Sequence, residues 1–274
     1  MALFSIRPDL QISAEIFGGV LPQTTFFVHG NLASNNWWLP SLEVWKKKKA
    51  EATPGSMILA EFRGCGKSTP PQSLRDVDMR LFAQDFIALV EGLQSGKLAA
   101  AIKGPYNLVG HSTGGLICAL MAASRPGLFN RVLLLDSVGA HGVSFDDSMK
   151  QAFDQMKASK DLTAAVIGST ILNNDPNNEF FKTKIVEDAF YAVKTVGSWV
   201  LESLKGFNGE AELSKVRNKT LVLHGENDVL LPRQDSEKMA KIMHAEFKLI
   251  PGQGHCCNFE NPAKFVEIAH QFLF

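Results

Sequence analysis

The sequence predicts an α/β fold in which a mainly parallel sheet of eight strands carries helices on both faces. Two observations predict it. Short runs of β-branched and apolar residues alternate with longer segments of helical periodicity, which is typical of parallel strands joined by helices. The strand pattern then stops from residue 139 to residue 214, where helical patterns replace it. A length of 274 residues suits one large α/β domain with a helical insertion.

The strands are expected where short apolar runs end at turn residues. The first two, at residues 3–7 and 12–17, lie close together and are followed by Gly18 and Gly19, so we expect a hairpin that ends at these glycines. The other six are predicted at residues 25–28, 56–62, 106–109, 131–136, 220–223 and 246–250.

Helices are expected between these strands. Residues 76–93 place their apolar side chains close to the spacing of one buried helical face, which should pack on the sheet. Residues 116–123 form an apolar helix-like run directly after the fifth strand. Residues 262–274 form a closing helix, with Asn261 as its N-cap and Pro262 in its first turn.

The insertion divides the chain into three segments. Residues 1–138 and 215–274 are expected to form the core, and residues 139–214 a helical cap. The cap has more apolar residues than one helical stripe needs, so we expect some to line a substrate cavity and others to fill the core of the cap. Its large aromatic residues are Phe145, Phe153, Phe180, Phe181, Phe190, Tyr191 and Trp199.

The charge balance argues against polyanionic partners. Lys and Arg together number 28, as do Asp and Glu, so no net field favours nucleic acid or an acidic membrane. No run approaches the roughly 20 apolar residues of a membrane span, and the amino terminus lacks the pattern of a signal peptide. The sequence therefore predicts a cytoplasmic protein without a membrane span, and leaves its oligomeric state open.

The four cysteines do not indicate a disulfide framework or a metal site. Cys256 and Cys257 are adjacent and follow His255, but zinc ligands are usually two to four residues apart, and no second Cys/His cluster is present. We expect reduced thiols, no bound metal and no cofactor.

The segment from Gly110 to Gly114, with the sequence G-H-S-T-G, carries the first sign of chemistry. It lies between the fifth strand and a helix, the context of a nucleophile elbow. A serine on so sharp a turn adopts a strained backbone, and the flanking glycines remove side chains that would collide there. Ser112 is therefore a candidate nucleophile.

A serine hydroxyl needs a base to accept its proton and an acid to orient that base. The strand at residues 220–223 leads into a loop that presents Asp228, and the strand at 246–250 leads into a glycine-rich loop that presents His255. The chain order is thus serine, aspartate, histidine. Asp136, at the end of the sixth strand, is the alternative acid.

Five motifs in order resemble those of the α/β-hydrolase superfamily, over nearly the whole chain. They are H-G-N at residues 29–31, R-G-C-G-K-S at 63–68, the elbow at 110–114, G-E-N-D-V-L-L-P at 225–232 and G-Q-G-H at 252–255. The resemblance implies the α/β-hydrolase fold with a helical cap.

The resemblance also implies roles. Ser112 would be the nucleophile, His255 the general base and then acid, and Asp228 the residue that fixes the imidazole tautomer. Backbone N–H groups of Asn31 and Thr113 would form the oxyanion hole, and the Asn31 amide offers a further contact to substrate. Some superfamily members take their acid from the position of Asp136, but the match of the later loop favours Asp228.

The implied reaction is hydrolysis of a small or medium carboxylic ester through an acyl-enzyme at Ser112. Serine at the elbow argues against the haloalkane dehalogenases and epoxide hydrolases, which use aspartate. The same triad serves carbon–carbon bond hydrolases, lactonases, thioesterases and perhydrolases, and the elbow also resembles that of cofactor-free haloperoxidases. A small-molecule receptor with vestigial turnover is the alternative from another class. The expected partner is a small ester-like substrate, and carbon–carbon bond hydrolysis would instead take a diketone-like substrate.

Overall fold

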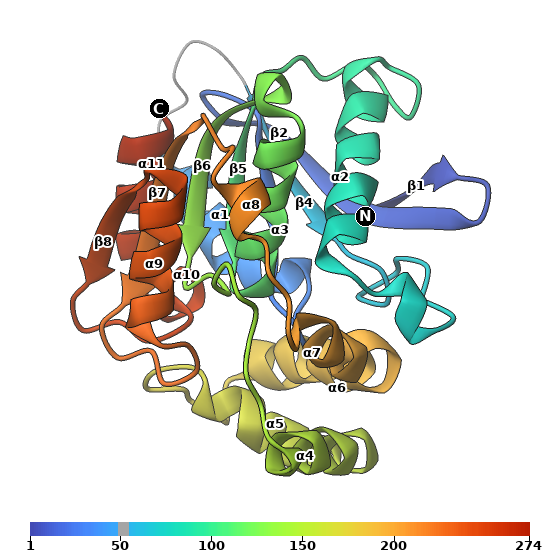
Figure 1. Cartoon of the computed structure of the whole chain (residues 1–274), viewed down its shortest axis with the longest axis vertical. Coiled ribbons are helices and arrows are strands. Elements are labelled where there is room, and N and C mark those ends of the chain that lie inside the picture. The colour runs from blue at the N-terminus through green and yellow to red at the C-terminus, as the bar shows by residue number, and fades with distance from the viewer. Residues whose placement is uncertain (49–54) are drawn as a thin grey trace.

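The computed structural model describes residues 1–48 and 55–274. Its eight strands form one sheet in the order β1-β2-β4-β3-β5-β6-β7-β8 (Figure 1). β2 runs antiparallel to β1 and β4, and all other neighbours are parallel. The strands are β1 (Ala2–Arg7), β2 (Leu10–Leu21), β3 (Thr25–Val28), β4 (Gly55–Glu61), β5 (Tyr106–His111), β6 (Phe129–Leu135), β7 (Lys219–Gly225) and β8 (Glu246–Ile250). The predicted mainly parallel sheet is confirmed.

The opening hairpin is longer than the sequence predicts. Gly18 and Gly19 were expected to end the second strand, but β2 continues to Leu21. Its pairing with β4 shifts register between Gly18 and Leu21, and Gly19 has a φ of 70°. The two glycines therefore form an irregularity within the strand, which glycine tolerates because it has no Cβ.

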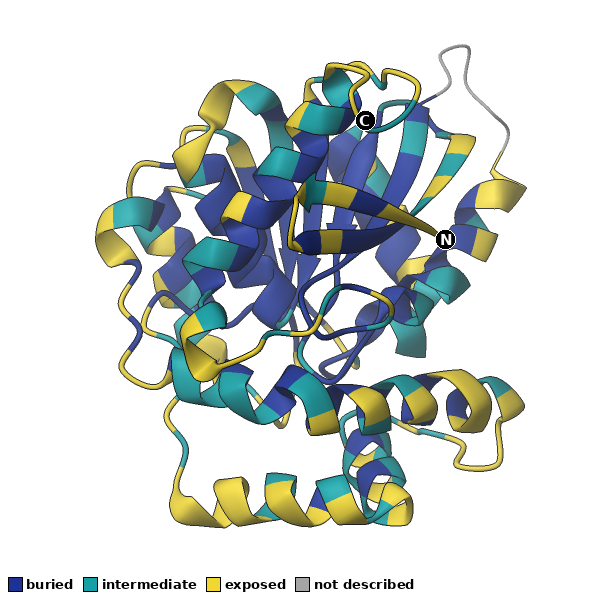
Figure 2. Cartoon of the chain, turned by 90° about the vertical axis from the view of Figure 1, so that its right-hand side faces the viewer, coloured by how far each residue is buried: buried dark blue, intermediate teal, exposed yellow. Residues whose placement is uncertain are grey.

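Helices cover both faces of the sheet (Figure 2). On one face, α1 and α11 pack through an apolar cluster that includes Trp38, Trp45 and Phe265. On the other face, α2, α3 and α9 share the larger cluster. The core helices are η1 (Asn35–Trp38), α1 (Leu39–Lys47), η2 (Leu74–Asp76), α2 (Met79–Gln94), α3 (Thr113–Ser124), η3 (Pro126–Leu128), α9 (Arg233–Met243), α10 (Cys257–Glu260) and α11 (Pro262–Leu273).

Side-chain caps determine where two of the predicted helices begin. The Asp78 side chain accepts hydrogen bonds from the N–H groups of Arg80 and Leu81, so α2 begins at Met79, three residues later than predicted. The Asn261 side chain accepts from the Lys264 N–H, as expected for the N-cap of α11. A polar residue that satisfies free N–H groups thus marks each start.

Residues 139–214 contain helices and one isolated β-bridge within the part of the chain that the structure describes. The helices are α4 (Asp147–Ala158), α5 (Lys160–Ser169), the π-helical η4 (Phe181–Ile185), α6 (Val186–Ala192), the π-helical η5 (Val193–Gly197), α7 (Ser198–Leu204) and α8 (Glu210–Leu213). Figure 1 shows α4 to α7 grouped beyond one end of the sheet, the end at which β6 leads into them.

The two halves of this helical segment are attached to the core differently. The Asp188 carboxylate on α6 accepts hydrogen bonds of 2.5 Å from Ser34 and Asn36, and the Thr195 hydroxyl on η5 donates to the Gly64 carbonyl at 2.6 Å. By contrast, the side-chain hydrogen bonds and ion pairs of α4 stay within residues 139–214, as far as the described residues go. Polar contacts therefore tie the α6–η5 half to the core, whereas α4 packs on α5, η5 and α7 within the same helical segment.

Within the described ranges, no helix combines the length and apolar character needed to cross a membrane.

Candidate functional site

The turn between β5 and α3 has the geometry of a nucleophile elbow. Ser112 has φ 54° and ψ −122°, a conformation that is strained for a residue with a side chain. A Cβ at Gly110 would lie 2.3 Å from the Gly114 carbonyl oxygen, and one at Gly114 would lie 2.4 Å from the His29 carbonyl oxygen. Both positions therefore require glycine, and the turn holds the Ser112 side chain at the carboxyl end of a central strand.

The loop after β3 lies against this elbow. A Cβ at Gly30 would be 2.9 Å from the Ser112 Cβ, so the absence of a side chain allows the close approach. The next N–H group, that of Asn31, and the N–H of Thr113 at the start of α3 donate to no acceptor within the described residues. One of these free donors directly follows Ser112, and the other directly follows the glycine that packs against it, so both are candidates for an oxyanion hole.

The Asn31 side chain is engaged elsewhere. Its Nδ2 donates to the Gly197 carbonyl at 3.0 Å, and its Oδ1 accepts from the Leu32 N–H at 3.0 Å. The amide therefore joins the loop to η5. Asn31 also lines the cavity described below, and its amide keeps a second N–H and a second lone pair, so a direct contact with substrate stays a prediction.

The structure brings the predicted base and acid together. The His255 Nδ1 donates to Asp228 Oδ2 at 2.8 Å, although the two residues are 27 positions apart. Asp228 Oδ1 accepts from the N–H groups of Leu230 and Leu231 at 2.7 and 3.2 Å. Burial opposes ionisation, but the bonds from His255 and from these N–H groups outweigh it and hold the pKa of Asp228 below its usual value. The Asp228 carboxylate is therefore suited to pair with an imidazolium.

A cavity of about 930 Å³ contains Ser112 and His255 in its wall, together with Asn31 and Thr113. Among the described residues, no hydrogen bond joins the Ser112 hydroxyl to His255. Such bonds are often long before a substrate is bound and tighten in the complex. The cavity is the place where a bound substrate would meet both side chains.

Asp136, the alternative acid, lies behind this pair. It is fully buried, and its Oδ1 accepts from the Gly225 N–H at 2.7 Å. Burial and the neighbouring Asp228 carboxylate raise its pKa well above the usual range, which favours the neutral acid. Within the described residues no hydrogen bond or ion pair joins Asp136 to His255, whereas Asp228 is hydrogen-bonded to His255 directly.

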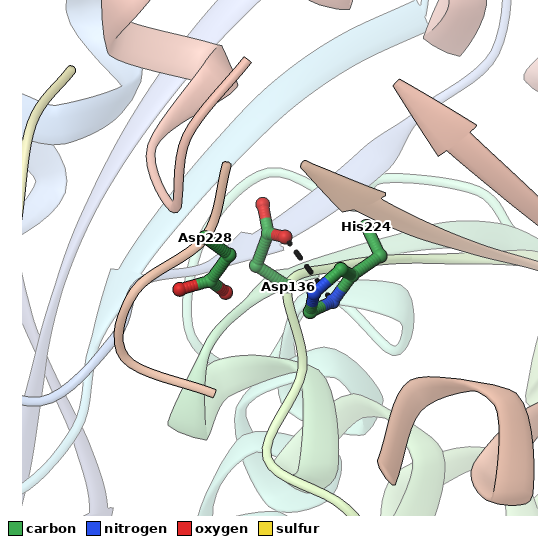
Figure 3. A group of neighbouring side chains, drawn as sticks. All are labelled: Asp136, His224 and Asp228. Atoms are coloured by element: carbon green, nitrogen blue, oxygen red, sulfur yellow. Dashed lines mark ion pairs between the residues drawn. The ribbon is translucent and has the colours of Figure 1, made fainter. Parts of the chain in front are cut away.

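Asp136, His224 and Asp228 also form a group whose potential ligand atoms lie within 4.8 Å of one another (Figure 3). The His224 Nδ1 lies 3.0 Å from the Ser236 hydroxyl and 3.5 Å from Asp136 Oδ1. Together with the bonds of the two carboxylates, these contacts already engage most of the atoms that a cation would need. The group therefore fits a hydrogen-bonding network behind the Asp228–His255 pair better than a metal site.

Two buried histidines brace the site. The His111 Nε2 donates to the His255 carbonyl at 2.9 Å, and the His29 Nδ1 donates to the Gly30 carbonyl at 2.8 Å. Burial lowers the pKa of His111 to about 3 and that of His29 to about 4, so both are neutral at neutral pH. They hold the base loop and the oxyanion loop in place.

The pH dependence of stability should reveal this state of His111. In the unfolded chain the pKa of His111 is about 6.5. Below that pH the unfolded chain therefore binds a proton at His111, while the buried His111 of the folded chain stays neutral. The contribution of His111 to the free energy of unfolding is therefore complete above pH 6.5 and is lost as the pH falls toward about 3. We expect the stability advantage of the wild type over His111→Gln to shrink by up to about 1.4 kcal/mol per pH unit below 6.5.

Urea unfolding of both proteins between pH 7.5 and pH 4.5 measures that advantage. The exposed Ser124 supplies the control, because Ser124→Ala removes no titratable group and its difference from the wild type should be the same at every pH. An advantage of the wild type over His111→Gln that stays constant across this range would contradict a neutral, buried His111.

The cavity wall is only partly predictable from the aromatic residues of the insertion. Phe145 and Phe153 line it, whereas the other five that were singled out do not. Phe181 is buried in the core cluster, and Tyr191 is 40% exposed. Sequence reasoning missed Trp37, which lines the cavity and stacks near His111 with ring centres 6.2 Å apart. No local pattern distinguishes it from an ordinary core tryptophan.

The sheet order, the strained serine after β5 and the acid and histidine loops after β7 and β8 define a protein of the α/β-hydrolase fold class. The chain belongs to the alpha/beta hydrolase family, which it matches over residues 26–268.

Two similar proteins are distant relatives of this chain. The chain is 26% identical to a 2-hydroxymuconate semialdehyde hydrolase of Pseudomonas sp. (strain CF600) over 264 residues, 90% of this chain and 85% of that protein. It is 24% identical to Protein ABHD8 of Bos taurus over 254 residues, 90% of this chain but 55% of that protein. The chain thus spans about half the length of ABHD8.

Solved structures share the fold over almost the whole chain. An esterase from Exiguobacterium antarcticum superposes with a TM-score of 0.79 at 17% identity, covering 99% of this chain and 98% of the other. An enol-lactonase from Burkholderia xenovorans LB400 gives 0.77 at 18% identity, with 99% of both chains covered. A bromoperoxidase from Bacillus anthracis gives 0.78 at 19% identity, also with 99% of both covered.

Proposed function

We propose that the protein is a serine hydrolase that cleaves a small or medium carboxylic ester. The observation that carries the proposal is the 2.8 Å hydrogen bond between His255 and Asp228, on a cavity wall that also holds the strained Ser112. An acid, a base and a nucleophile on the three expected loops are what acyl transfer by a serine requires.

The proposed reaction has two steps. The Ser112 Oγ attacks the ester carbonyl while His255 Nε2 accepts its proton, and the tetrahedral intermediate collapses to an acyl-serine as the alcohol leaves with that proton. Water then attacks the acyl-serine, gives a proton to His255, and the carboxylic acid leaves as the proton returns to Ser112. Asp228 holds His255 in the tautomer that presents Nε2 and stabilises the imidazolium.

The N–H groups of Asn31 and Thr113 are proposed to bind the oxyanion that forms in both steps. They are free of other acceptors among the described residues and flank Ser112. One such donor is typically worth ~3 to 4 kcal/mol of barrier lowering.

The helical segment 139–214 is proposed to be a cap that selects the substrate, on a core made of residues 1–138 and 215–274. Helices α4, α5 and α7 contribute wall residues to the cavity, and the core contributes the triad. In this division the core carries the chemistry, and the cap determines which substrates reach it.

Neighbouring chemistries use the same side chains. The names of the similar proteins include a semialdehyde hydrolase and an enol-lactonase, so carbon–carbon bond and lactone hydrolysis are the nearest alternatives. Thioester hydrolysis and perhydrolysis would also pass through an acyl-serine. A receptor with vestigial turnover would keep the cavity and lose the reactivity of Ser112.

Covalent labelling tests the proposal. A fluorophosphonate should add one adduct per chain, measured by intact-protein mass spectrometry and mapped to the peptide that contains Ser112, and Ser112→Ala should remain unlabelled. The same preparation should hydrolyse short 4-nitrophenyl esters. A folded wild-type protein that binds apolar ligands but takes no label would instead support the receptor.

A further inference from the structure

The size and the lining of the cavity limit which substrates can bind beside Ser112 and His255. Its volume of about 930 Å³ is at the upper end of the roughly 300–1,000 Å³ typical of small-molecule sites. It extends from Ser112 and His255 at the core to helices α4 and α5, so space for a substrate of medium size lies on the side of the triad that faces the cap.

Helix α4 turns an apolar face to this cavity. Met149, Ala152, Phe153 and Met156 all line it, at the spacing of one helical face. Solvent exposure falls along this face, from Met149, which is 39% exposed, to Met156, which is fully buried. These two residues are seven positions apart, or about 10 Å along the helix axis. The apolar lining thus runs from solvent to the interior over the length of a medium acyl chain.

Positive charge is missing from the wall. Within the described residues, no Lys or Arg lines the cavity, and Asp146 is its one carboxylate. Two lysines lie close to the wall without lining it, and one of them, Lys205, lies over the ring of the wall residue Phe145. Lys150 pairs with Glu202 at 3.6 Å, and the Lys205 Nζ lies 5.3 Å from the centre of the Phe145 ring.

Asp146 adds a negative charge at the exposed end of the cavity, where it caps α4. The Ser148 hydroxyl and the Met149 N–H donate to its carboxylate, and these bonds lower the pKa of Asp146. The terminal carboxylate of an anionic substrate would either lie beside this negative charge at the exposed end or lose its hydration further inside without a cationic partner. Both situations are unfavourable.

We propose that the substrate of this cavity is an uncharged ester with a medium-sized apolar body, and that carboxylate-bearing esters of equal size are rejected. This inference rests on the proposed ester hydrolysis at Ser112 and specifies its substrate class. The apolar face of α4 binds the body of the substrate, and the absence of a cation on the wall excludes the anionic analogue.

A matched pair of substrates tests it. 4-Nitrophenyl octanoate and the mono-4-nitrophenyl ester of octanedioic acid have the same chain length and leaving group and differ by one terminal carboxylate. The wild type should prefer the neutral ester by at least about 100-fold in kcat/KM. Among neutral esters, kcat/KM should rise several-fold from the acetate to the octanoate, because each buried methylene contributes to binding.

Two variants of α4 locate the selectivity. Ala152→Arg places a cation on the cavity face of α4. It should reduce the kcat/KM ratio of the neutral to the anionic ester at least about tenfold. Gln151→Arg is the matched control. Gln151 is exposed, precedes Ala152 on the same helix and does not line the cavity. The kcat/KM ratio of the two esters should therefore stay as in the wild type.

The outcomes separate the two proposals. If fluorophosphonate labels Ser112 and the anionic ester is cleaved as fast as the neutral one, the substrate class is wrong and the serine hydrolase stands. The substrate class would also be wrong if both arginine variants reduced the kcat/KM ratio of the neutral to the anionic ester equally. The effect would then come from the added net charge of the protein and not from a cation in the cavity. A protein that takes no label and cleaves neither ester would overturn the proposed function and this inference with it.

Discussion

Replacing Ser112 by alanine is expected to lower kcat for ester hydrolysis by on the order of 10⁶-fold, the size of loss seen when a serine nucleophile is removed from an intact triad. The reason is that water must then attack the ester directly, with only the oxyanion donors and binding to help it. The change removes one oxygen atom from a residue that is already held at φ 54° by its neighbours, so the fold should persist. Kinetics with a 4-nitrophenyl ester, together with circular dichroism, measure both effects.

The control for this substitution is Ser124→Ala. Ser124 is the last residue of α3, the helix that Ser112 precedes, and it is exposed and far along the helix from the elbow. It should retain wild-type kcat. A Ser112→Ala protein with more than about a hundredth of wild-type kcat would show that another group is the nucleophile.

Replacing Asp228 by asparagine is expected to lower kcat by about 10⁴-fold. The asparagine keeps the size of the side chain but removes the charge that stabilises the His255 imidazolium, and its amide NH₂ can favour the wrong imidazole tautomer. The 2.8 Å bond from His255 and the lowered pKa of Asp228 make it the charged partner of the base. The measurement is kcat for a neutral 4-nitrophenyl ester at pH 7 to 8.

Asp136→Asn is the matched comparison. Burial and the nearby Asp228 carboxylate already favour a neutral Asp136, so a neutral amide changes little charge, and its oxygen can still accept from the Gly225 N–H. We expect kcat within about tenfold of the wild type, since the geometry of the acid loop is kept. If Asp136→Asn cost more than Asp228→Asn, the acid role would belong to Asp136.

The fold and the loops that carry Ser112, Asp228 and His255 could be predicted from the sequence because their signals are local. The strands β3 to β8 are short apolar runs, and the elbow, acid and base loops follow three of them directly. Parallel strands carry their carboxyl ends to one edge of the sheet, so residues at those ends meet there in any such fold. This explains why His255 and an aspartate could be expected to meet, while the choice of Asp228 over Asp136 rested on the resemblance of its loop to the family motif.

The contacts between the cap and the core could not be predicted, because they join residues that no local pattern connects. Asn31 and Gly197 are 166 positions apart, and the bond between them depends on how η5 lies on the oxyanion loop. The sequence likewise offers no reason why Phe153 should line the cavity while Phe181 packs into the core. Both are aromatic residues in helical segments, and tertiary packing alone decides between them.

The Asn31–Gly197 bond also divides the cap into parts with different freedom to vary. Because η5 holds the loop that carries Asn31, one of the two proposed oxyanion donors, changes in η5 should alter the rate with every substrate. Helix α4 has no such bond to the core among the described residues, so its cavity face can change while the catalytic loops stay in place. For directed evolution, α4 is the segment to randomise for new specificities, and η5 is the segment to keep constant.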